Sequence, residues 1–275
     1  KTMYRKAFFI LAAFIMILPW MSAQTDETYI CIPLLTDKTV TQIEVDIHGK
    51  IYALVQNQYL YKLNTQGEII AQFSYPAYGK ISFFSVNNPE KIFLFYKDAG
   101  VLLLLNDQLV VLSQPILLFD LDFFNITLAT YVNNSFYLLD QQDEKLIVLD
   151  HFLKIKQQIQ LPHEAQNCKK IVANLDNSVI LYDEREGFFF YDSFGNFEKK
   201  IGLKVPHDFQ FWGERVIFPE KSILKEYYFD RLEFKETELN RVFNPEIQIN
   251  SLRIHTQFFV VVDVQGKLYL CRLNR

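Results

Sequence analysis

The sequence is short of four residue types, with only 9 glycines, 3 cysteines, 3 methionines and 2 tryptophans among 275 residues. No two cysteines form a CxxC pair, so the spacing gives no cysteine-based metal site. Basic residues (28) are fewer than acidic ones (32), and the net charge of −4 lacks the basic footprint of nucleic-acid binding. After residue 20 no apolar run is long enough to span a bilayer.

Hydrophobic and aromatic residues are abundant instead. Half of the chain is hydrophobic, and it contains 26 phenylalanines and 15 tyrosines. Aromatic side chains favour β-strands, and this hydrophobicity argues against disorder. We therefore expect a strand-rich fold with a large aromatic core.

The N-terminal residues predict export. Arg5 and Lys6 precede an apolar stretch at residues 7–20, and "MSAQ" follows it. This order is typical of a secretory signal peptide, with cleavage after Ala23 and Lys1–Thr2 as an upstream extension. An uncleaved membrane anchor is the alternative, for which the stretch is short. We expect the mature chain, residues 24–275, in the periplasm, at the outer membrane or outside the cell.

Short apolar runs recur along the chain at a nearly constant spacing. They start at residues 50, 91, 135, 178, 215 and 258, so successive starts differ by 41, 44, 43, 37 and 43 residues. Each run follows a weaker strand that ends in a polar turn, and each precedes a third strand. In the first five units a fourth strand follows, which in the second unit we place at residues 109–113. Four antiparallel strands per forty residues, repeated six times, predict a six-bladed β-propeller.

Two distant stretches illustrate the repeat. "LYKLNTQGEIIAQFS" at residues 60–74 and "FFFYDSFGNFEKKIGL" at residues 188–203 have the same order of apolar run, polar turn with glycine, and second run. We interpret both as the third and fourth strands of a blade, joined by a hairpin. Five prolines lie between units, where a missing N–H group does no harm to a strand ladder: Pro76, Pro115, Pro162, Pro206 and Pro245.

The sixth unit ends after its third strand, at "KLYLCRLNR". The segment "TYICIPLL" at residues 28–35 is a candidate for the missing strand, and its pairing there would close the ring and remove an exposed edge. Cys31 and Cys271 would then lie on paired strands. An exported protein can keep a disulfide there, although two buried neighbouring thiols are the alternative. Cys168 remains a free thiol in either case.

These features resemble the superfamily of six-bladed β-propellers, which includes NHL-type, TolB-type and lactonase-type domains. The aromatic strand, the Asp or Asn, the glycine and the charged strand of residues 60–74 and 188–203 are most similar to exported propeller proteins of Bacteroidota-type bacteria. No WD, YWTD, kelch or sialidase motif recurs at the blade spacing. The resemblance implies a shape and an exported location, and fold alone does not imply an activity.

Two histidines lie one blade apart in predicted crossovers, in "LPHEAQN" and "VPHDF". His163–Glu164 and His207–Asp208 could bind a metal or act as an acid/base pair, but we favour solvated loop residues without chemistry. Lactonase-type propellers hold calcium in the channel, which makes a set of oxygen ligands worth testing. None of them can be matched individually to that family: Asp120, Asp122, Glu164, Asn167 and Asp208.

Two further features are candidates for a binding surface. The predicted second-to-third-strand turns are acidic, with Asp143 in "DQQDEK" and Glu184 in "DEREG", and could attract a basic partner. The crossover "ILLFDLDFFNITL" at residues 116–128 contains Phe119, Phe123 and Phe124. If exposed, these rings would mark a partner site. We favour their folding into the core.

The sequence is therefore best interpreted as a single six-bladed β-propeller, exported, without cofactor or catalysis of its own. It would act as a platform that binds a cell-envelope protein or surface ligand, as a monomer within a complex. The alternative is a calcium-dependent hydrolase of lactonase type at the channel mouth. A purely structural subunit of an envelope assembly is a third possibility.

Overall fold

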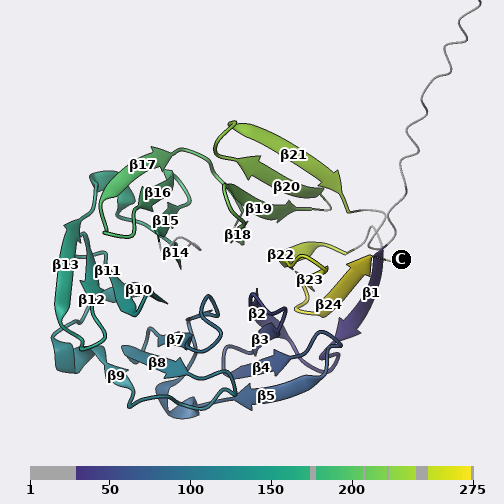
Figure 1. Cartoon of the computed structure of the whole chain (residues 1–275), viewed down its shortest axis with the longest axis horizontal. Helices are drawn as coiled ribbons and strands as arrows, with labels where there is room; N and C mark the ends of the chain where they lie inside the picture. The colour runs from purple at the N-terminus through teal and green to yellow at the C-terminus, as the bar shows by residue number, and fades with distance from the viewer. Residues whose placement is uncertain (1–28, 174–177, 207, 222, 240–246, 274–275) are drawn as a thin grey trace, which may run out of the picture.

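The computed structural model describes residues 29–173, 178–206, 208–221, 223–239 and 247–273. The predicted signal peptide, His207 and Pro245 lie outside these residues. Six four-stranded antiparallel sheets form a ring, which confirms the six-bladed β-propeller (Figure 1). The helical segments of the described residues are three short 3₁₀ helices: η1 (Pro76–Tyr78), η2 (Leu118–Leu121) and η3 (His163–Ala165).

Each blade runs from an inner strand at the channel to an outer strand at the rim. Blade 1 consists of β2 (Val40–Val45), β3 (Ile51–Val55), β4 (Tyr59–Leu63) and β5 (Ile69–Phe73). Blade 2 consists of β6 (Phe83–Ser85), β7 (Ile92–Tyr96), β8 (Val101–Leu105) and β9 (Ile116–Leu117). Blade 3 consists of β10 (Ile126–Val132), β11 (Ser135–Asp140), β12 (Lys145–Leu149) and β13 (Ile155–Gln160).

The second half of the ring repeats this order. Blade 4 consists of β14 (Lys170–Ala173), β15 (Val179–Asp183), β16 (Gly187–Tyr191) and β17 (Phe197–Ile201). Blade 5 consists of β18 (Gln210–Phe211), β19 (Arg215–Glu220), β20 (Ile223–Tyr228) and β21 (Glu233–Glu238). Blade 6 consists of β22 (Ile249–Ile254), β23 (Phe258–Asp263), β24 (Leu268–Leu273) and β1 (Tyr29–Leu34).

The ring closes as the sequence predicts. The N-terminal strand β1 pairs antiparallel with β24, and Figure 1 shows the purple strand beside the yellow one. In this register Cys31 faces Cys271, and the two form a disulfide across a sequence separation of 240 residues. Cys168 is free and buried, and burial raises the pKa of its thiol to about 12, so it is a packing residue rather than a reactive one.

The core lies between the blades rather than at the centre of the ring. Six clusters of buried apolar residues each join two neighbouring blades. On β7, for example, Leu94 packs toward blade 1 and Phe93 toward blade 3. Successive side chains of a strand point to opposite faces, and both faces are covered, which explains why the second strands read as unbroken apolar runs.

The two stretches that display the repeat have the same hairpin. Asn64 Oδ1 accepts hydrogen bonds from the backbone N–H groups of Gln66 (2.9 Å) and Glu68 (3.0 Å), and Gly67 has φ +86°. Asp192 and Gly195 make the equivalent turn in blade 4, with φ +83° at the glycine. A side-chain acceptor followed by a residue in the left-handed region is therefore the local rule of this repeat.

One predicted strand is misplaced. In blade 2, residue 111 forms only an isolated bridge to Leu105, and the fourth strand of the sheet is β9, after Pro115. Asn106 organises a turn over residues 106–110, and Pro115 has no N–H group to donate to a ladder. The outer strand is thus interrupted, and Pro115 lies before it rather than in the crossover after it.

Candidate functional site

One face of the ring is formed by the crossovers between blades together with the turns between second and third strands. Backbone hydrogen bonds join the two kinds of loop: Leu118 N–H donates to the Gly100 carbonyl (2.8 Å) and Leu161 N–H to that of Glu144 (2.8 Å). We call this the crossover face. The turns between third and fourth strands lie at the other end of the third strands, and hence on the opposite face.

The predicted residues of blades 3 and 4 lie on the crossover face. His163 and Glu164 in η3 are exposed, as is Asn167 just after it. His163 Nδ1 contacts the side-chain amide of Gln166, which also donates to Glu144, and no group of three possible metal ligands forms there among the described residues. The neighbouring histidine at position 207 is not described. Whether His163 takes part in chemistry stays a prediction, since the described residues include only one of the two histidines.

The acidic turn residues are also on this face. Asp143 is exposed and forms a long ion pair of 3.9 Å with Lys145. Glu184 is exposed in the corresponding turn of blade 4. Both positions can meet a partner, and exposed ion pairs of this kind add little to folding stability.

The aromatic crossover of blade 2 corrects our expectation of a buried loop. Phe119 is 72% exposed and Phe124 is 64% exposed, and their rings are in edge contact with centroids 5.5 Å apart. Asp120 and Asp122 beside them are exposed as well. Only Phe123 turns inward, toward the cluster between blades 2 and 3. We call Phe119, Asp120, Asp122 and Phe124 the aromatic–acidic patch.

This patch is not a loosely held loop. Leu118 is buried (1% exposed), and its carbonyl accepts the N–H of Phe123 at 2.9 Å. The Asp122 N–H donates to the Phe119 carbonyl at 3.1 Å and ends η2. The segment is therefore fixed by its own anchor while it holds two large apolar rings in solvent.

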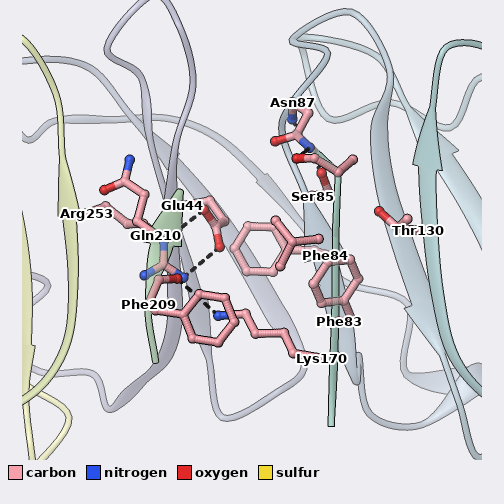
Figure 2. Close-up of a pocket in the computed structure, with 12 residues that line it drawn as sticks. Glu44, Phe83, Phe84, Ser85, Asn87, Thr130, Lys170, Phe209, Gln210 and Arg253 are labelled. Carbon is pink, nitrogen blue, oxygen red and sulfur yellow. Dashed lines mark hydrogen bonds and ion pairs between the residues drawn. The ribbon is translucent and has the colours of Figure 1, made fainter. Parts of the chain in front are cut away.

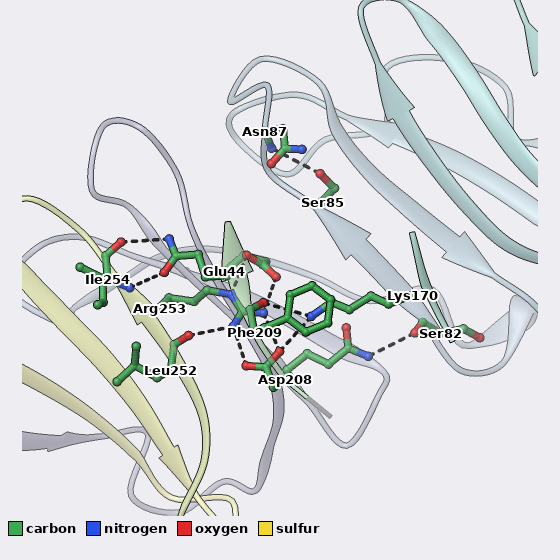
Figure 3. Close-up of polar contacts among 12 residues, drawn as sticks. Glu44, Ser82, Ser85, Asn87, Lys170, Asp208, Phe209, Leu252, Arg253 and Ile254 are labelled. Carbon is green, nitrogen blue, oxygen red and sulfur yellow. Dashed lines mark hydrogen bonds and ion pairs between the residues drawn. The ribbon is translucent and has the colours of Figure 1, made fainter. Parts of the chain in front are cut away.

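Asp208 is the one predicted residue that points into the channel rather than onto the crossover face. Arg253 on β22 donates from Nη2 to Asp208 Oδ1 at 3.0 Å, and from Nε and Nη2 to Glu44 on β2 at 2.9 and 2.8 Å (Figure 3). Arg253 Nη1 donates to Asp208 Oδ2 and to the Leu252 carbonyl. All five N–H groups of the guanidinium are thereby used.

Lys170 on β14 completes this charged group. Its Nζ donates to Asp208 Oδ1 (3.1 Å) and to the Phe209 carbonyl (3.2 Å), and it lies 4.2 Å from the centroid of the Phe209 ring. Burial alone would raise the pKa of Asp208, but Arg253 and Lys170 outweigh it and lower that pKa to about 2. Burial alone would lower the pKa of Arg253, but the carboxylates of Asp208 and Glu44 outweigh it and raise that pKa above its usual value. We call Glu44, Lys170, Asp208 and Arg253 the ionic cluster.

A small cavity of about 50 Å³ lies in the channel beside the ionic cluster. Figure 2 shows the charged side chains on one side and Phe83, Phe84, Ser85, Asn87 and Thr130 on the other. We call it the channel pocket. Its remaining lining is formed by the following residues: Val172, Ala173, Phe209 and Gln210.

The proposed calcium ligands do not fit a common site. Asp120 and Asp122 belong to the crossover after blade 2, and Glu164 and Asn167 to the one after blade 3. Asp208 lies in the channel with both of its oxygens bound to cationic side chains. Within the ranges that the structure describes, no three His, Cys, Asp or Glu side chains form a group able to hold a metal ion.

Sequence reasoning identified Asp208 but missed its partners Glu44, Lys170 and Arg253. These residues lie on inner strands, whereas the predicted site residues lie in loops. The sequence does contain a signal for these partners. A charged residue within an otherwise apolar inner strand, as in "TQIEV" and "SLRI", has to meet a counter-charge at the channel.

Comparison with known proteins agrees on the fold. No protein-family model and no curated protein sequence matches the chain. Virginiamycin B lyase from Staphylococcus aureus matches at a TM-score of 0.59 and 12% identity, over 90% of this chain and 99% of that one. The Pan2 WD40 domain of Neurospora crassa matches at 0.60 and 8%, over 90% and 94%. The fold is a six-bladed β-propeller.

A third match carries a label of location. A Bacteroides fragilis protein labelled as exported matches at a TM-score of 0.57 and 12% identity, over 90% of this chain and 96% of that one. At these identities the likenesses show the fold alone. No helix in the described part of the chain is long and apolar enough to cross a membrane.

Proposed function

We propose that the protein is an exported, non-catalytic binding module that docks a protein of the cell envelope on its crossover face. The observation that carries this proposal is the exposure of Phe119 and Phe124 on a segment with its own buried anchor. Folding gains nothing from holding two phenylalanine rings in water. Large aromatic residues are, in contrast, the side chains that dominate binding energy when a partner covers them.

The charges around the rings favour a partner with basic groups. Asp120 and Asp122 flank the two rings, and Asp143 and Glu184 lie on the same face in blades 3 and 4. Negative charges at the rim of an apolar contact steer a positively charged partner and fix its orientation. The partner surface would combine an apolar pocket for Phe119 with lysine or arginine at its edge.

Two observations support the export that this function requires. The order of charge, apolar stretch and small residues before residue 24 is that of a signal peptide. The Cys31–Cys271 disulfide is a feature of proteins that leave the reducing cytoplasm. The match to a Bacteroides fragilis protein labelled as exported is consistent with the same location.

The alternative of a calcium-dependent hydrolase is less well supported. Asp208, the only one of its predicted ligands at the channel, is engaged by Arg253 and Lys170. An ion there would have to displace two cationic side chains from a partly buried carboxylate. A purely structural envelope subunit would use the same crossover face, so it is a special case of the docking proposal.

Matched variants test the proposal. Phe119→Ser with Phe124→Ser removes the proposed contact, and Phe152→Ser with Phe194→Ser removes two equally exposed rings (69% and 76%) on the opposite face. Each protein is used to capture partners from cross-linked cells of its own source. The same envelope protein should accompany the wild type and the control pair but not the first pair. Equal capture by both pairs, or capture of nothing by the wild type, would contradict the proposal.

A further inference from the structure

The turns between third and fourth strands differ at one position whose residue type the turn geometry does not fix. In blades 1 to 4, an Asn or Asp side chain at the start of the turn accepts the N–H of the residue two positions later, at 2.8 to 3.0 Å. That residue is Gln66 in blade 1 and Gln108 in blade 2. In blades 3 and 4 it is Phe152 and Phe194. The same turn therefore forms with glutamine, and its geometry does not explain the two phenylalanines.

Both phenylalanines project into solvent on the face opposite to the crossover face. Phe152 is 69% exposed and Phe194 is 76% exposed, and Leu232 in the shorter turn of blade 5 is 68% exposed. The three hairpins follow one another along one half of the ring (Figure 1). We call Phe152, Phe194 and Leu232 the apolar tips. A further exposed apolar residue follows in each hairpin: Ile155, Phe197 and Phe234.

The turns that carry the tips are firmly held. Asp192 Oδ1 accepts the N–H groups of both Phe194 (2.9 Å) and Asn196 (2.7 Å), and the turn of blade 3 has the same pair of bonds. Gly195 is packed so closely on Ile159 of blade 3 that a Cβ atom added to it would lie 2.6 Å from that side chain. Large apolar side chains that a firm support holds in water mark a contact surface.

The charged side chains beside the tips of blades 3 and 4 are mainly basic. Lys154 and Lys156 in blade 3 and Lys199 in blade 4 are exposed, and none of them forms an ion pair within the ranges that the structure describes. Glu198 is the exposed carboxylate of these two hairpins. Free ammonium groups around apolar side chains complement the phosphate groups that cover the apolar layer of a membrane.

The aromatic–acidic patch on the crossover face has the opposite character. Its rings contact each other and are flanked by Asp120 and Asp122, which anionic lipid head groups would repel. Such a cluster suits a protein interface, in which the residues that dominate binding lie together near the centre. The apolar tips instead protrude from separate blades. A fluid lipid layer needs no preformed pockets and can accept several separate side chains at once.

We propose that the protein lies on a phospholipid membrane through the face opposite to the crossover face. The apolar tips insert below the lipid head groups, and Lys154, Lys156 and Lys199 contact the phosphates. This inference goes beyond the docking function and uses none of its residues. In this orientation the crossover face points away from the membrane and stays open to its protein partner.

Vesicle flotation tests the proposal. The chain from residue 24 is purified, because the apolar stretch at residues 7–20 could bind lipid by itself. It is mixed with vesicles of phosphatidylcholine, prepared with and without phosphatidylglycerol. We expect the protein to float with the vesicles, and to partition about tenfold more strongly into those with phosphatidylglycerol because of the free lysines.

Glutamine variants assign the binding to the tips. Phe152→Gln, Phe194→Gln and Leu232→Gln introduce the residue that the turns of blades 1 and 2 already contain, so the triple variant should keep the wild-type unfolding curve. It should partition at least about tenfold more weakly, because three apolar side chains no longer enter the lipid. Phe119→Ser with Phe124→Ser leaves the tips intact and should float like the wild type.

A fluorescent reporter and a measurement without lipid complete the test. The emission of Phe194→Trp should shift to shorter wavelength when vesicles are added, and that of Phe119→Trp should not. Sedimentation without lipid should give the wild type and the triple variant the same molecular mass. The proposal is overturned if the wild type does not float, if phosphatidylglycerol has no effect, or if the triple variant floats as well as the wild type. Equal loss in the Phe119, Phe124 pair, the reverse result with the two reporters, or dimers of the wild type alone would overturn it too.

Discussion

Arg253 and Glu44 are 209 residues apart in sequence and bind each other as a bidentate ion pair, with N–O distances of 2.8 and 2.9 Å. Arg253 belongs to the inner strand of blade 6 and Glu44 to that of blade 1, so the pair crosses the seam at which the ring closes. The Cys31–Cys271 disulfide closes the same blade at its outer edge. The ring is thus fastened at the channel and at the rim.

Removal of Arg253 should be strongly destabilising. Its side chain is 6% exposed, and Arg253→Met would leave the carboxylates of Glu44 and Asp208 without their main counter-charge. We expect a loss of about 3–5 kcal/mol in the free energy of unfolding, measured with denaturant. Lys225→Met, which breaks exposed ion pairs to Glu220 on β19 and Glu236 on β21 in blade 5, is the control and should change stability little. Equal effects of the two changes would contradict the structural role of Arg253.

Asp208 should make the protein sensitive to acid in a defined range. Its pKa falls from 3.8 to about 2 on folding, so its contribution to stability is complete above about pH 4 and is lost as the pH falls toward 2. Unfolding curves of the wild type and Asp208→Asn are compared at a series of pH values. The wild type should be the more stable at pH 7, and this advantage should shrink by about 2 kcal/mol between pH 5 and pH 2. A difference that does not vary with pH would show that Asp208 is not held ionised by its neighbours.

Reduction of the Cys31–Cys271 disulfide should loosen the whole ring. A link across 240 residues restricts the unfolded chain strongly, and we expect the oxidised protein to be about 4 kcal/mol more stable than the reduced one. The Cys31→Ser, Cys271→Ser variant should match the reduced wild type and should not respond to reductant. If reductant left the wild-type unfolding curve unchanged, the disulfide would not stabilise this fold.

Gly187 should not tolerate a side chain. It begins β16 with φ +92°, and a Cβ atom there would collide with the carbonyl oxygen of Ile201. Gly202 is the matched control, because a Cβ atom added there meets nothing within 4 Å. We expect Gly187→Ala to cost about 2 kcal/mol or more in thermal or chemical unfolding, and Gly202→Ala to be nearly neutral. The reverse order would contradict the close approach of Gly187 to the Ile201 carbonyl.

The architecture could be predicted because it depends on local patterns. The six apolar runs are buried on both faces, and the hairpins repeat an acceptor side chain followed by a left-handed residue, as at Asn64 and Gly67. The truncated sixth unit likewise required a partner strand, which the N-terminal residues supply. Such features are visible in a single sequence because most units repeat them and the one unit that departs from the repeat stands out.

The site was harder to predict because it depends on how units face one another. Glu44, Lys170 and Arg253 come together only because three inner strands line one channel, and no local pattern encodes that distance. Phe119 was expected in the core because its neighbours are apolar, yet Leu118 and Phe123 fill the available space and leave it in solvent. Hydrophobicity along a crossover does not reveal which rings the packing can accept.

The contact of Phe119 with a partner is tested most directly by site-specific photo-crosslinking in cells of the protein's own source. A photoreactive phenylalanine analogue is placed at Phe119 in one strain and at the more exposed Phe194 on the opposite face in another. We expect a single crosslinked envelope protein from position 119 and none from position 194. No adduct from position 119, or the same adducts from both positions, would contradict it.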